Sequence, residues 1–343
     1  MSDIGWDIGG VHLKAARAEH GRIVDAVQIA APLRAGLDPL INAFGQAKVR
    51  MGPAARHLVT MTAELADTFT SRAEGVEQIA TLAARELNGA PVWLYAGRAG
   101  FVPIARAPAH IADIASANWH ASAALVARRS EQALFIDMGS TTTDIVPVSA
   151  GTVIARGYTD AERLSAGELV YTGLVRGFVM ATAARAPFQG VWTPLVNENF
   201  ANMADVHRIL GHLPDDADQM ATADGRAKTV EASCARLARM VGRDTAHASE
   251  SAWLALAQWF AERQIRTIVD GAMLVLSCGN MPADAPILGA GIGHAVVREA
   301  ARRLGRNYVA FESILDVAPD ARERASHCAP AAALAALASV ASA

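Results

Sequence analysis

The stretch Phe135-Ile136-Asp137-Met138-Gly139-Ser140-Thr141-Thr142-Thr143-Asp144-Ile145-Val146-Pro147-Val148 decides how the rest of the chain is interpreted. Two apolar runs flank a tight polar turn, and this pattern predicts a β-hairpin. Gly139 lets the backbone turn sharply and approach a ligand closely. The turn residues offer hydroxyl and N–H donors that phosphate oxygens accept from, namely those of Ser140, Thr141, Thr142 and Thr143.

Two carboxylates, Asp137 and Asp144, bracket this turn. Carboxylate oxygens are hard ligands that suit Mg²⁺. The stretch therefore predicts a phosphate-binding hairpin beside a metal site. A polar hairpin with ordinary turn residues is the alternative, although four hydroxyls between two acids are unusual in such a hairpin.

The N-terminus repeats the pattern in Ile4-Gly5-Trp6-Asp7-Ile8-Gly9-Gly10-Val11-His12-Leu13-Lys14-Ala15-Ala16. Again a strand leads to an acid, glycines and polar side chains, and a second strand follows. Two such hairpins predict two similar subdomains that face each other across a cleft. Asp7 and Asp137 would then converge on one Mg²⁺. Lys14 would reach a phosphate or, as the alternative, is a surface lysine at a strand edge.

A third glycine turn lies near the C-terminal end, in Pro286-Ile287-Leu288-Gly289-Ala290-Gly291-Ile292-Gly293. A strand is expected to end in this turn and a helix to begin at His294. Gly289 and Gly291 would let the backbone approach a bound molecule. Alone this motif is weak, but as the third glycine turn in this order it is stronger.

These three turns resemble those of the sugar kinase, heat-shock-70 and actin superfamily, and most of all its hydantoinase A and oxoprolinase branch. The resemblance implies an α/β fold with two lobes, the actin-like ATPase or ribonuclease H-like fold, around a central cleft. We expect a first lobe over residues 1–130 and a second over 131–343, with a helical insertion around 190–270. In the first turn, Val11 and His12 stand where a threonine is common.

A closer resemblance, to the synthase family of methanofuran-type cofactor assembly, lies in four other stretches. They are Thr60-Met61-Thr62-Ala63-Glu64-Leu65-Ala66-Asp67, Tyr171-Thr172-Gly173-Leu174-Val175-Arg176, Asn202-Met203-Ala204-Asp205-Val206-His207-Arg208-Ile209-Leu210-Gly211 and Thr222-Ala223-Asp224-Gly225. The resemblance implies an enzyme that joins an aminomethyl-furan diphosphate to a tyramine- or tyrosine-type phenol and releases diphosphate. It also implies small-molecule partners and Mg²⁺ as the cofactor.

The residues are compatible with this chemistry. Gly9, Gly10 and the second polar turn would cradle the diphosphate. A phenol pKa of about 10 requires a base at neutral pH, and the candidates are His12, Glu64 and Asp137. Asp144 is a further catalytic candidate.

Three more residues are candidates for substrate binding. Arg176 can pair bidentately with a carboxylate or a diphosphate. Asp205 and Asp224 either bind substrate or order their loop. Each of the three has a capping or solvated residue as its alternative.

The composition is that of a globular protein of 343 residues with a net charge of −3. That charge gives no electrostatic case for nucleic acid. Cys234, Cys278 and Cys328 lack CxxC spacing and are interpreted as reduced thiols of a cytoplasmic protein. No targeting signal is expected before the first strand. The apolar run Ala329–Ala343 is too short for a membrane span and is expected to be a packed helix. A homodimer is the assembly that we consider.

Between the turns, alternating strands and helices are expected. A helix over Glu250–Val269 is expected to place its aromatic residues in the core, and a strand is expected over Met273–Ser277. Gly151–Tyr158 is also expected to be a strand.

Two other functions remain open at this point. One is ATP-dependent ring opening or phosphorylation, as in the hydantoinase and kinase relatives. The other is nucleotide sensing without chemistry.

Overall fold

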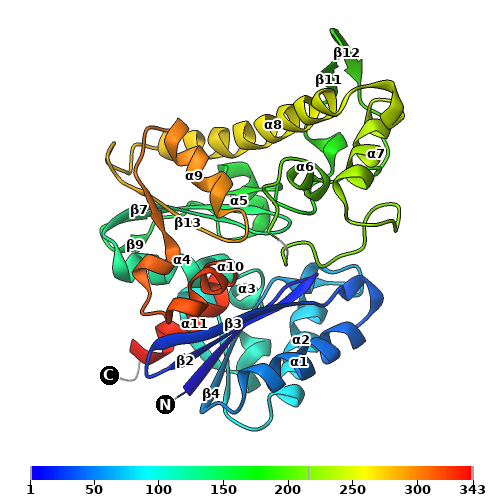
Figure 1. The fold of residues 1–343 in the computed structure, drawn as a ribbon. Helices are drawn as coiled ribbons and strands as arrows, with labels where there is room; N and C mark the ends of the chain where they lie inside the picture. Colours follow the sequence, from blue (N-terminus) through cyan, green and yellow to red (C-terminus); the bar gives the residue numbers. More distant parts are fainter. Residues whose placement is uncertain (1, 215, 341–343) are drawn as a thin grey trace.

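The computed structural model describes residues 2–214 and 216–340, which form two lobes, each built on one β-sheet (Figure 1). The first sheet has the strand order β3-β2-β1-β4-β5-β6. Its strands are β1 (Ser2–Ile8), β2 (His12–Glu19), β3 (Arg22–Ala30), β4 (Arg56–Met61), β5 (Val92–Tyr95) and β6 (Phe101–Pro103). The expected two-lobed α/β architecture is present.

The second sheet has the order β10-β8-β7-β13-β14, with β9 paired to β8. Its strands are β7 (Gln132–Met138), β8 (Thr143–Ser149), β9 (Thr152–Val153), β10 (Leu169–Val170), β13 (Ile287–Ala290) and β14 (Tyr308–Ala310). In both sheets a central strand, β1 or β7, pairs antiparallel with the next strand and parallel with a later one, β4 or β13. The two lobes therefore share one topology around their hairpins.

Helices cover both sheets. Those that precede the second sheet in the chain are α1 (Asp38–Met51), α2 (Arg72–Glu86), α3 (Ile111–Ile114) and α4 (Asn118–Arg129). The later ones are α5 (Asp160–Ala166), α6 (Met203–Ile209), α7 (Val230–Met240), α8 (Glu250–Leu276), α9 (His294–Arg303), α10 (Arg322–His327) and α11 (Ala329–Val340). Short 3₁₀ turns connect several of these elements, among them η1 (Leu33–Ala35) and η2 (Ala63–Leu65).

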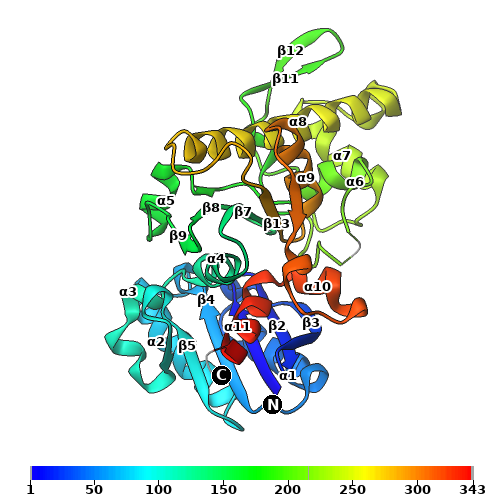
Figure 2. The same ribbon diagram turned by 90° about the vertical axis from the view of Figure 1, so that its left-hand side faces the viewer.

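The long helix α8 runs across the far side of the second lobe, and the hairpin β11 (Arg185–Phe188) and β12 (Val191–Pro194) projects beyond it (Figure 2). Trp253 and Phe260 of α8 are buried in a core that α6 and α7 share. The expectation that the aromatic residues of this helix belong to the core is confirmed for these two, whereas Trp259 is half-buried and packs against that core.

Side-chain caps set the start of several helices. Ser71 accepts a hydrogen bond from the N–H of Glu74 at the start of α2. Thr159 with Glu162, and Asn202 with Asp205, form capping boxes at α5 and α6. Each cap satisfies N–H groups that the helix cannot pair itself.

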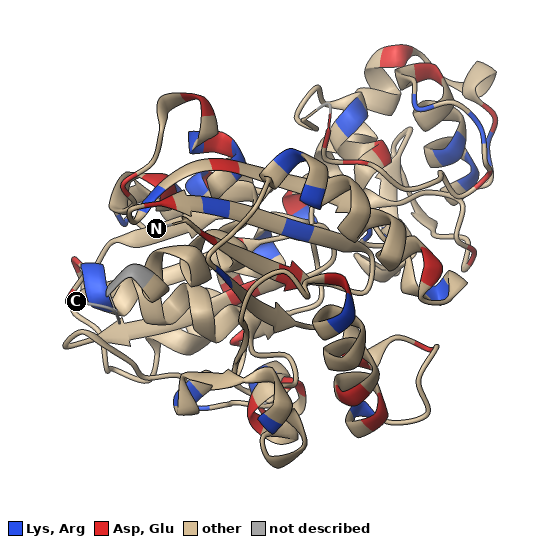
Figure 3. Cartoon of the chain, turned by 90° about the horizontal axis from the view of Figure 1, so that it is seen from below, with Lys and Arg blue, Asp and Glu red and all other residues tan. Residues whose placement is uncertain are grey.

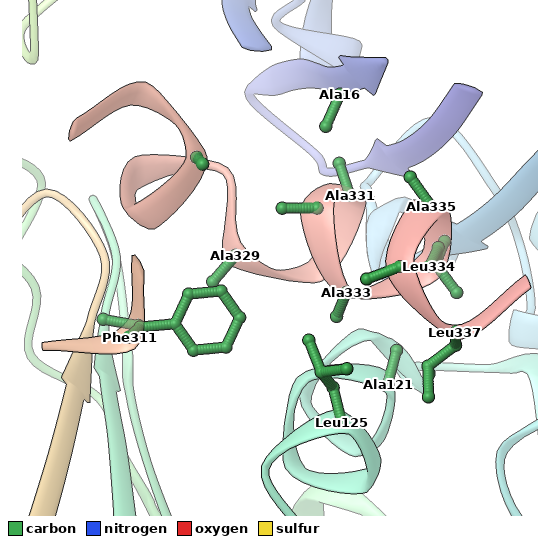
Figure 4. Close-up of a cluster of buried hydrophobic side chains, with 14 of the residues drawn as sticks. Ala16, Ala121, Leu125, Phe311, Ala329, Ala331, Ala333, Leu334, Ala335 and Leu337 are labelled. Carbon is green, nitrogen blue, oxygen red and sulfur yellow. The ribbon is translucent and has the colours of Figure 1, made fainter. Parts of the chain in front are cut away.

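The alanine-rich helix α11 lies between the first sheet and α4 (Figure 4). Its alanines are buried together with Leu334 and Leu337, in one apolar cluster with Ala121 and Leu125 of α4. Small side chains allow a helix to approach a sheet closely. A Cβ at Gly5 of β1 would lie 2.0 Å from the carbonyl oxygen of Ala331, so this strand position requires glycine.

This packing bears on the division into lobes. We expected α11 to belong with residues 131–343, but the helix contacts β1, β2 and β4 of the first sheet. The division at residue 130 stays a proposal, and the C-terminal helix α11 packs on the sheet of the first lobe. Residues 341–343 of the expected terminal helix lie outside the described part of the chain.

Two strand predictions were wrong. Met273–Ser277 is not a strand, because α8 continues to Leu276 and buries Ala272 and Val275 on its inner face. A short apolar run has no period that separates a strand from the end of a buried helix. Of Gly151–Tyr158, only β9 is extended in a sheet.

Basic and acidic residues are interspersed along the same helices and loops (Figure 3). This distribution accords with the net charge of −3. Among the described residues, none of the helices combines the length with the apolar character that crossing a membrane requires.

The contact between Gly5 and α11 gives a first prediction. Gly5→Ala should destabilise the protein by about 1–3 kcal/mol, because the added methyl group forces α11 away from the sheet. Gly45→Ala in α1 is the matched control, since a Cβ there meets nothing within 4 Å and alanine favours a helix. Urea unfolding measures both changes. Equal midpoints for Gly5→Ala and the wild type would contradict the packing.

Candidate active site

A cavity of about 650 Å³ lies between the two lobes, where both hairpins end. Gly10 and Val11 of the first hairpin line it, and Thr141 and Thr142 of the second hairpin line it as well. Other lining residues come from both lobes: Arg34, Thr62, Asp67, Ser116, Asn118, Trp119, Asp144, Asp160, Arg163, Arg176, Asn202 and Thr222. The expected cleft between facing hairpins is therefore present.

The two hairpins close in the same way. The N–H of Gly9 donates to the carbonyl of His12 at 2.9 Å, and that of Gly139 donates to the carbonyl of Thr142 at 2.9 Å. Each turn therefore presents its polar residues at the end of a central strand. Polar turns with closely spaced N–H groups can hold an anion, so both turns are candidates for phosphate binding.

The hydroxyls of the second turn differ in their availability. Ser140 Oγ and Thr141 Oγ1 lie 3.5 Å apart beside the cavity. Thr143 is buried, and its hydroxyl donates to the carbonyl of Thr172 at 2.7 Å. Thr143 therefore anchors the turn rather than offering a free hydroxyl to a ligand.

Lys14 lies among the three acids of the hairpins. Its Nζ is 3.9 Å from Asp7 Oδ2, and strand pairing places Asp7 opposite Lys14 and Asp137 opposite Asp144. Burial acts to lower the pKa of Lys14, but the negative charges of Asp7, Asp137 and Asp144 outweigh it and raise the pKa. The lysine therefore stays charged.

Burial has the opposite effect on the acids. It raises the pKa of Asp137 to about 7, against the attraction of Lys14 and together with repulsion from Asp144 and Asp7. Burial also raises the pKa of Asp7 and of Asp144. Three carboxylates face only two cations, Lys14 and, at Asp144, Arg163, so the cluster favours an added proton or cation.

Two buried acids of the hairpins, Asp7 and Asp137, are the candidate ligands for Mg²⁺. Asp7 Oδ1 is buried and lacks a hydrogen-bond partner in the structure, which suits a metal ligand. Within the described residues, no three acids, histidines or cysteines are arranged to hold a metal. A Mg²⁺ held by Asp7 and Asp137 would therefore take most of its ligands from phosphate oxygens and water, as Mg²⁺ commonly does.

Asp144 has a partner that the sequence did not indicate. Arg163 of α5 donates to Asp144 Oδ1 at 2.8 Å and lies over the ring of Trp119, 4.1 Å from its centroid. Arg163 is only 2% exposed. This buried pair holds the start of β8 against the wall of the cavity.

His12 is buried next to two cations. Burial, Lys14 and Arg176 lower the pKa of His12 to about 3. The imidazole is therefore neutral at physiological pH, and its Nε2 lacks a hydrogen-bond partner. A neutral imidazole of low pKa is a weak base but can still donate one hydrogen bond to an anion.

Arg176 lies at the second turn. Its backbone N–H donates to the carbonyl of Ser140 at 2.8 Å, and its Nη1 contacts Thr141 Oγ1 at 3.4 Å. The segment approaches the turn closely because Gly173 has no Cβ, which would lie 2.5 Å from the backbone of Ser140. Arg176 and Arg34 line the cavity from opposite lobes, and neither has a carboxylate in ion-pair range among the described residues.

Asp205 and Asp224 lie outside the residues that line this cavity. The buried Arg236 pairs with Asp205 at 2.7 Å and with Asp224 at 3.1 Å. Arg208 links Asp205 to Asp218, whose loop borders the cavity. The geometry thus favours the alternative in which these acids order the loop.

The third glycine turn supports the second hairpin. A Cβ at Gly289 would lie 2.4 Å from the ring of Tyr308. Gly291 has a φ of +85°, and a Cβ there would lie 2.3 Å from the carbonyl oxygen of Met138. Both glycines allow close packing at the end of β7, and neither lines this cavity.

Sequence reasoning gave no site role to several residues that the fold brings to the cavity. These are Arg34, Ser116, Asn118, Trp119, Asp160 and Arg163. Asn118-Trp119 was visible as a polar and aromatic pair before a helix. The others stand in stretches without a motif, and only the fold assembles them.

The fold and the paired hairpin turns define a class of protein, the two-lobed α/β proteins with the actin-like ATPase fold. A nucleotide-free acetone carboxylase structure matches 96% of this chain and 70% of its own, with a TM-score of 0.58 and 10% identity. At this identity the match describes the fold alone.

The chain belongs to the hydantoinase/oxoprolinase family, whose model matches residues 57–314. A curated relative from Methanocaldococcus jannaschii is 36% identical over 187 residues, which are 54% of this chain and 56% of the relative. One from Methanococcus vannielii is 32% identical over 111 residues, 32% of this chain and 50% of the relative. Both relatives are named (4-{4-[2-(gamma-L-glutamylamino)ethyl]phenoxymethyl}furan-2-yl)methanamine synthase.

The chain spans about half the length of the curated relatives that it matches. The resemblance inferred from the sequence, both to the hydantoinase A branch and to this synthase family, is confirmed.

The raised pKa of Asp137 gives the second prediction. The folded protein binds the carboxyl proton of Asp137 more tightly than the unfolded chain does. The loss of this proton therefore lowers the free energy of unfolding as the pH rises from about 4 to above 7. In EDTA, the free energy of unfolding of Asp137→Asn should be about 1–3 kcal/mol larger than that of the wild type at pH 8. The difference should be much smaller at pH 4.5. Urea unfolding at the two pH values measures this. A variant less stable than the wild type at pH 8 would show that Lys14 outweighs burial.

Proposed function

We propose that this protein is a synthase of methanofuran- or methylofuran-type cofactor assembly. It would join an aminomethyl-furan methyl diphosphate to the phenol of a glutamyltyramine- or tyrosine-type acceptor, forming an aryl ether and releasing diphosphate. The observation that carries the proposal is the pair of polar glycine turns at one cavity, in a chain whose curated relatives are named as this synthase.

The relatives' name describes the bond to be made. A phenoxymethyl-furan contains an ether between a phenol oxygen and the exocyclic carbon of the furan. The furan ring can share positive charge that develops on this carbon as the diphosphate departs. Stabilising the departing negative charge is then the main catalytic task.

This chain's residues suit that task. The N–H groups of the Gly9–Gly10 and Ser140–Thr142 turns would hold the diphosphate, and Lys14 and Arg176 would supply positive charge. Neutral His12, whose Nε2 is unpartnered, would add a hydrogen bond. Arg34 lines the cavity as well, and together with Arg176 it offers a guanidinium group to an anionic substrate.

Mg²⁺ would be held by Asp7 and Asp137, and when bound it supplies charge stabilisation to phosphoryl oxygens. Asp137 and Asp7 carry raised pKa values. An added cation beside them therefore favours their charged forms, and diphosphate and metal would bind together.

The family match also favours a second candidate function, ATP-dependent ring opening or phosphorylation, because the family model is described as hydantoinase/oxoprolinase. That function needs the γ-phosphate of ATP to be consumed. The synthase does not, because its substrate arrives already activated.

The third prediction separates these two functions. Incubated with the furan diphosphate and tyramine or glutamyltyramine, the protein should form the aryl ether without ATP, as followed by mass spectrometry. Inorganic diphosphate should inhibit competitively against the furan substrate, because both occupy the phosphate turns. Stoichiometric ATP loss with product, or no competition by diphosphate, would favour the ATP-dependent function instead.

The fourth prediction concerns the acids. Asp7→Asn should lower kcat by about 10²–10⁴-fold while the fold persists, because charge stabilisation of the leaving group is worth several kcal/mol. EDTA should have a comparable effect, reversed by Mg²⁺. Asp270→Asn on the exposed face of α8 is the control. Full activity of Asp7→Asn in EDTA would refute metal assistance.

A further inference from the structure

A buried carboxyl group, that of Glu64, lies behind one wall of the cavity. Glu64 belongs to the 3₁₀ turn η2 at the end of β4 and is only 1% exposed. Helix α2 packs directly against it, since a Cβ at Gly75 would lie 2.5 Å from the Glu64 carbonyl oxygen. Neighbours of Glu64 in the chain, Thr62 and Leu65, line the cavity itself.

Ser116 connects this carboxyl group to the cavity. Its Oγ donates to Glu64 Oε1 at 2.6 Å, and Ser116 lines the cavity. Glu64 Oε2 is buried without a hydrogen-bond partner. The second oxygen therefore remains free to accept a proton or a hydrogen bond.

The backbone of Ser116 is strained. Its φ is +53°, a left-handed conformation that few residues other than glycine adopt. Such conformations cost of the order of 1 kcal/mol and persist where the surrounding structure imposes them, often at functional sites. Here the conformation places the serine hydroxyl between the cavity and Glu64.

The charged groups that face this pair are Asp160 of α5 and Arg72 of α2. Ser116 Oγ lies 3.4 Å from Asp160 Oδ2, and Arg72 pairs with Asp160 at 2.8 Å. Asp160 is thus neutralised by Arg72, whereas Glu64 has no ion pair among the described residues. Burial raises the pKa of Glu64, against the hydrogen bond from Ser116. A carboxylate of raised pKa accepts protons more readily.

We propose that Ser116 and Glu64 form the proton relay that deprotonates the acceptor hydroxyl. The phenol oxygen forms its bond to the exocyclic furan carbon as the bond from that carbon to diphosphate breaks, and the diphosphate leaves with the electron pair. The phenol proton passes to Ser116 Oγ while the serine proton passes to Glu64. This inference rests on the proposed function and names the base that it requires.

The same wall suits an aromatic alcohol. Asn118 and Trp119 follow Ser116 closely in the chain and line the cavity beside it. The ring of Trp119 is covered by Arg163, but the exposed side chains of Tyr171 and Phe178 line the same cavity and offer aromatic surface that a phenol ring can pack against. The acceptor class is therefore an aromatic alcohol whose hydroxyl reaches Ser116.

The test compares phenols of different acidity. With tyramine, Glu64→Gln and Ser116→Gly should each lose about 10²–10⁴-fold in kcat, the usual contribution of a positioned base. With a difluorotyramine, whose phenol is more acidic, the same variants should lose less than about tenfold, because this phenol needs little help. Ser116→Gly also relieves the positive φ, so misfolding should not obscure the result.

Two controls keep the outcome clear. Glu77→Gln on the exposed face of α2 and Ser122→Ala in α4 change the same residue types away from the cavity and should behave as the wild type. If the wild type is active and the variants lose equally with both phenols, the relay is wrong and the proposed function stands. If the wild type forms no ether with any phenol, the proposed function fails and the relay fails with it.

Discussion

Three carboxylates that are balanced by only two cations, Lys14 and Arg163, are the constraint on which the cavity depends. Asp7 and Asp137 end the central strands of the two sheets, and Lys14 and Asp144 pair opposite them across each hairpin. Because these groups are buried, each negative charge raises the free energy of the others unless a cation is near. The two lobes therefore meet at a point that is stable without ligand only through Lys14, Arg163 and bound protons, and that gains from an incoming cation and phosphate.

The two hairpins can be predicted from local sequence. A hairpin is predicted where a strand ends in an acid and glycines and a second strand follows. Asp7 and Asp137 could therefore be assigned to the hairpins before the fold was known. The roles of single turn residues were harder to predict. Thr143 looks like its neighbours in sequence, yet its hydroxyl is used by Thr172. Asp205 and Asp224 stand in family-like stretches, yet Arg236 pairs with both.

Contacts between residues that are far apart in the chain could not be predicted. Ser116 meets Glu64 across 52 positions of chain, and no spacing rule links them. Arg163 pairs with Asp144 because α5 turns back over β8, a path that composition does not encode. The end of α8 shows the other limit, since an apolar run of five residues fits a strand as well as the last turns of a buried helix.

The seam between α11 and α4 has a mechanical consequence. Alanines such as Ala121 and Ala333 face one another there, and only a few larger side chains, such as Leu125 and Leu337, interlock across it (Figure 4). Packed helices move most readily by small sliding displacements, whereas large interdigitating side chains hold a fixed register. The seam therefore has few interlocking contacts of its own, and one continuous apolar core joins α11 and α4 to both sheets.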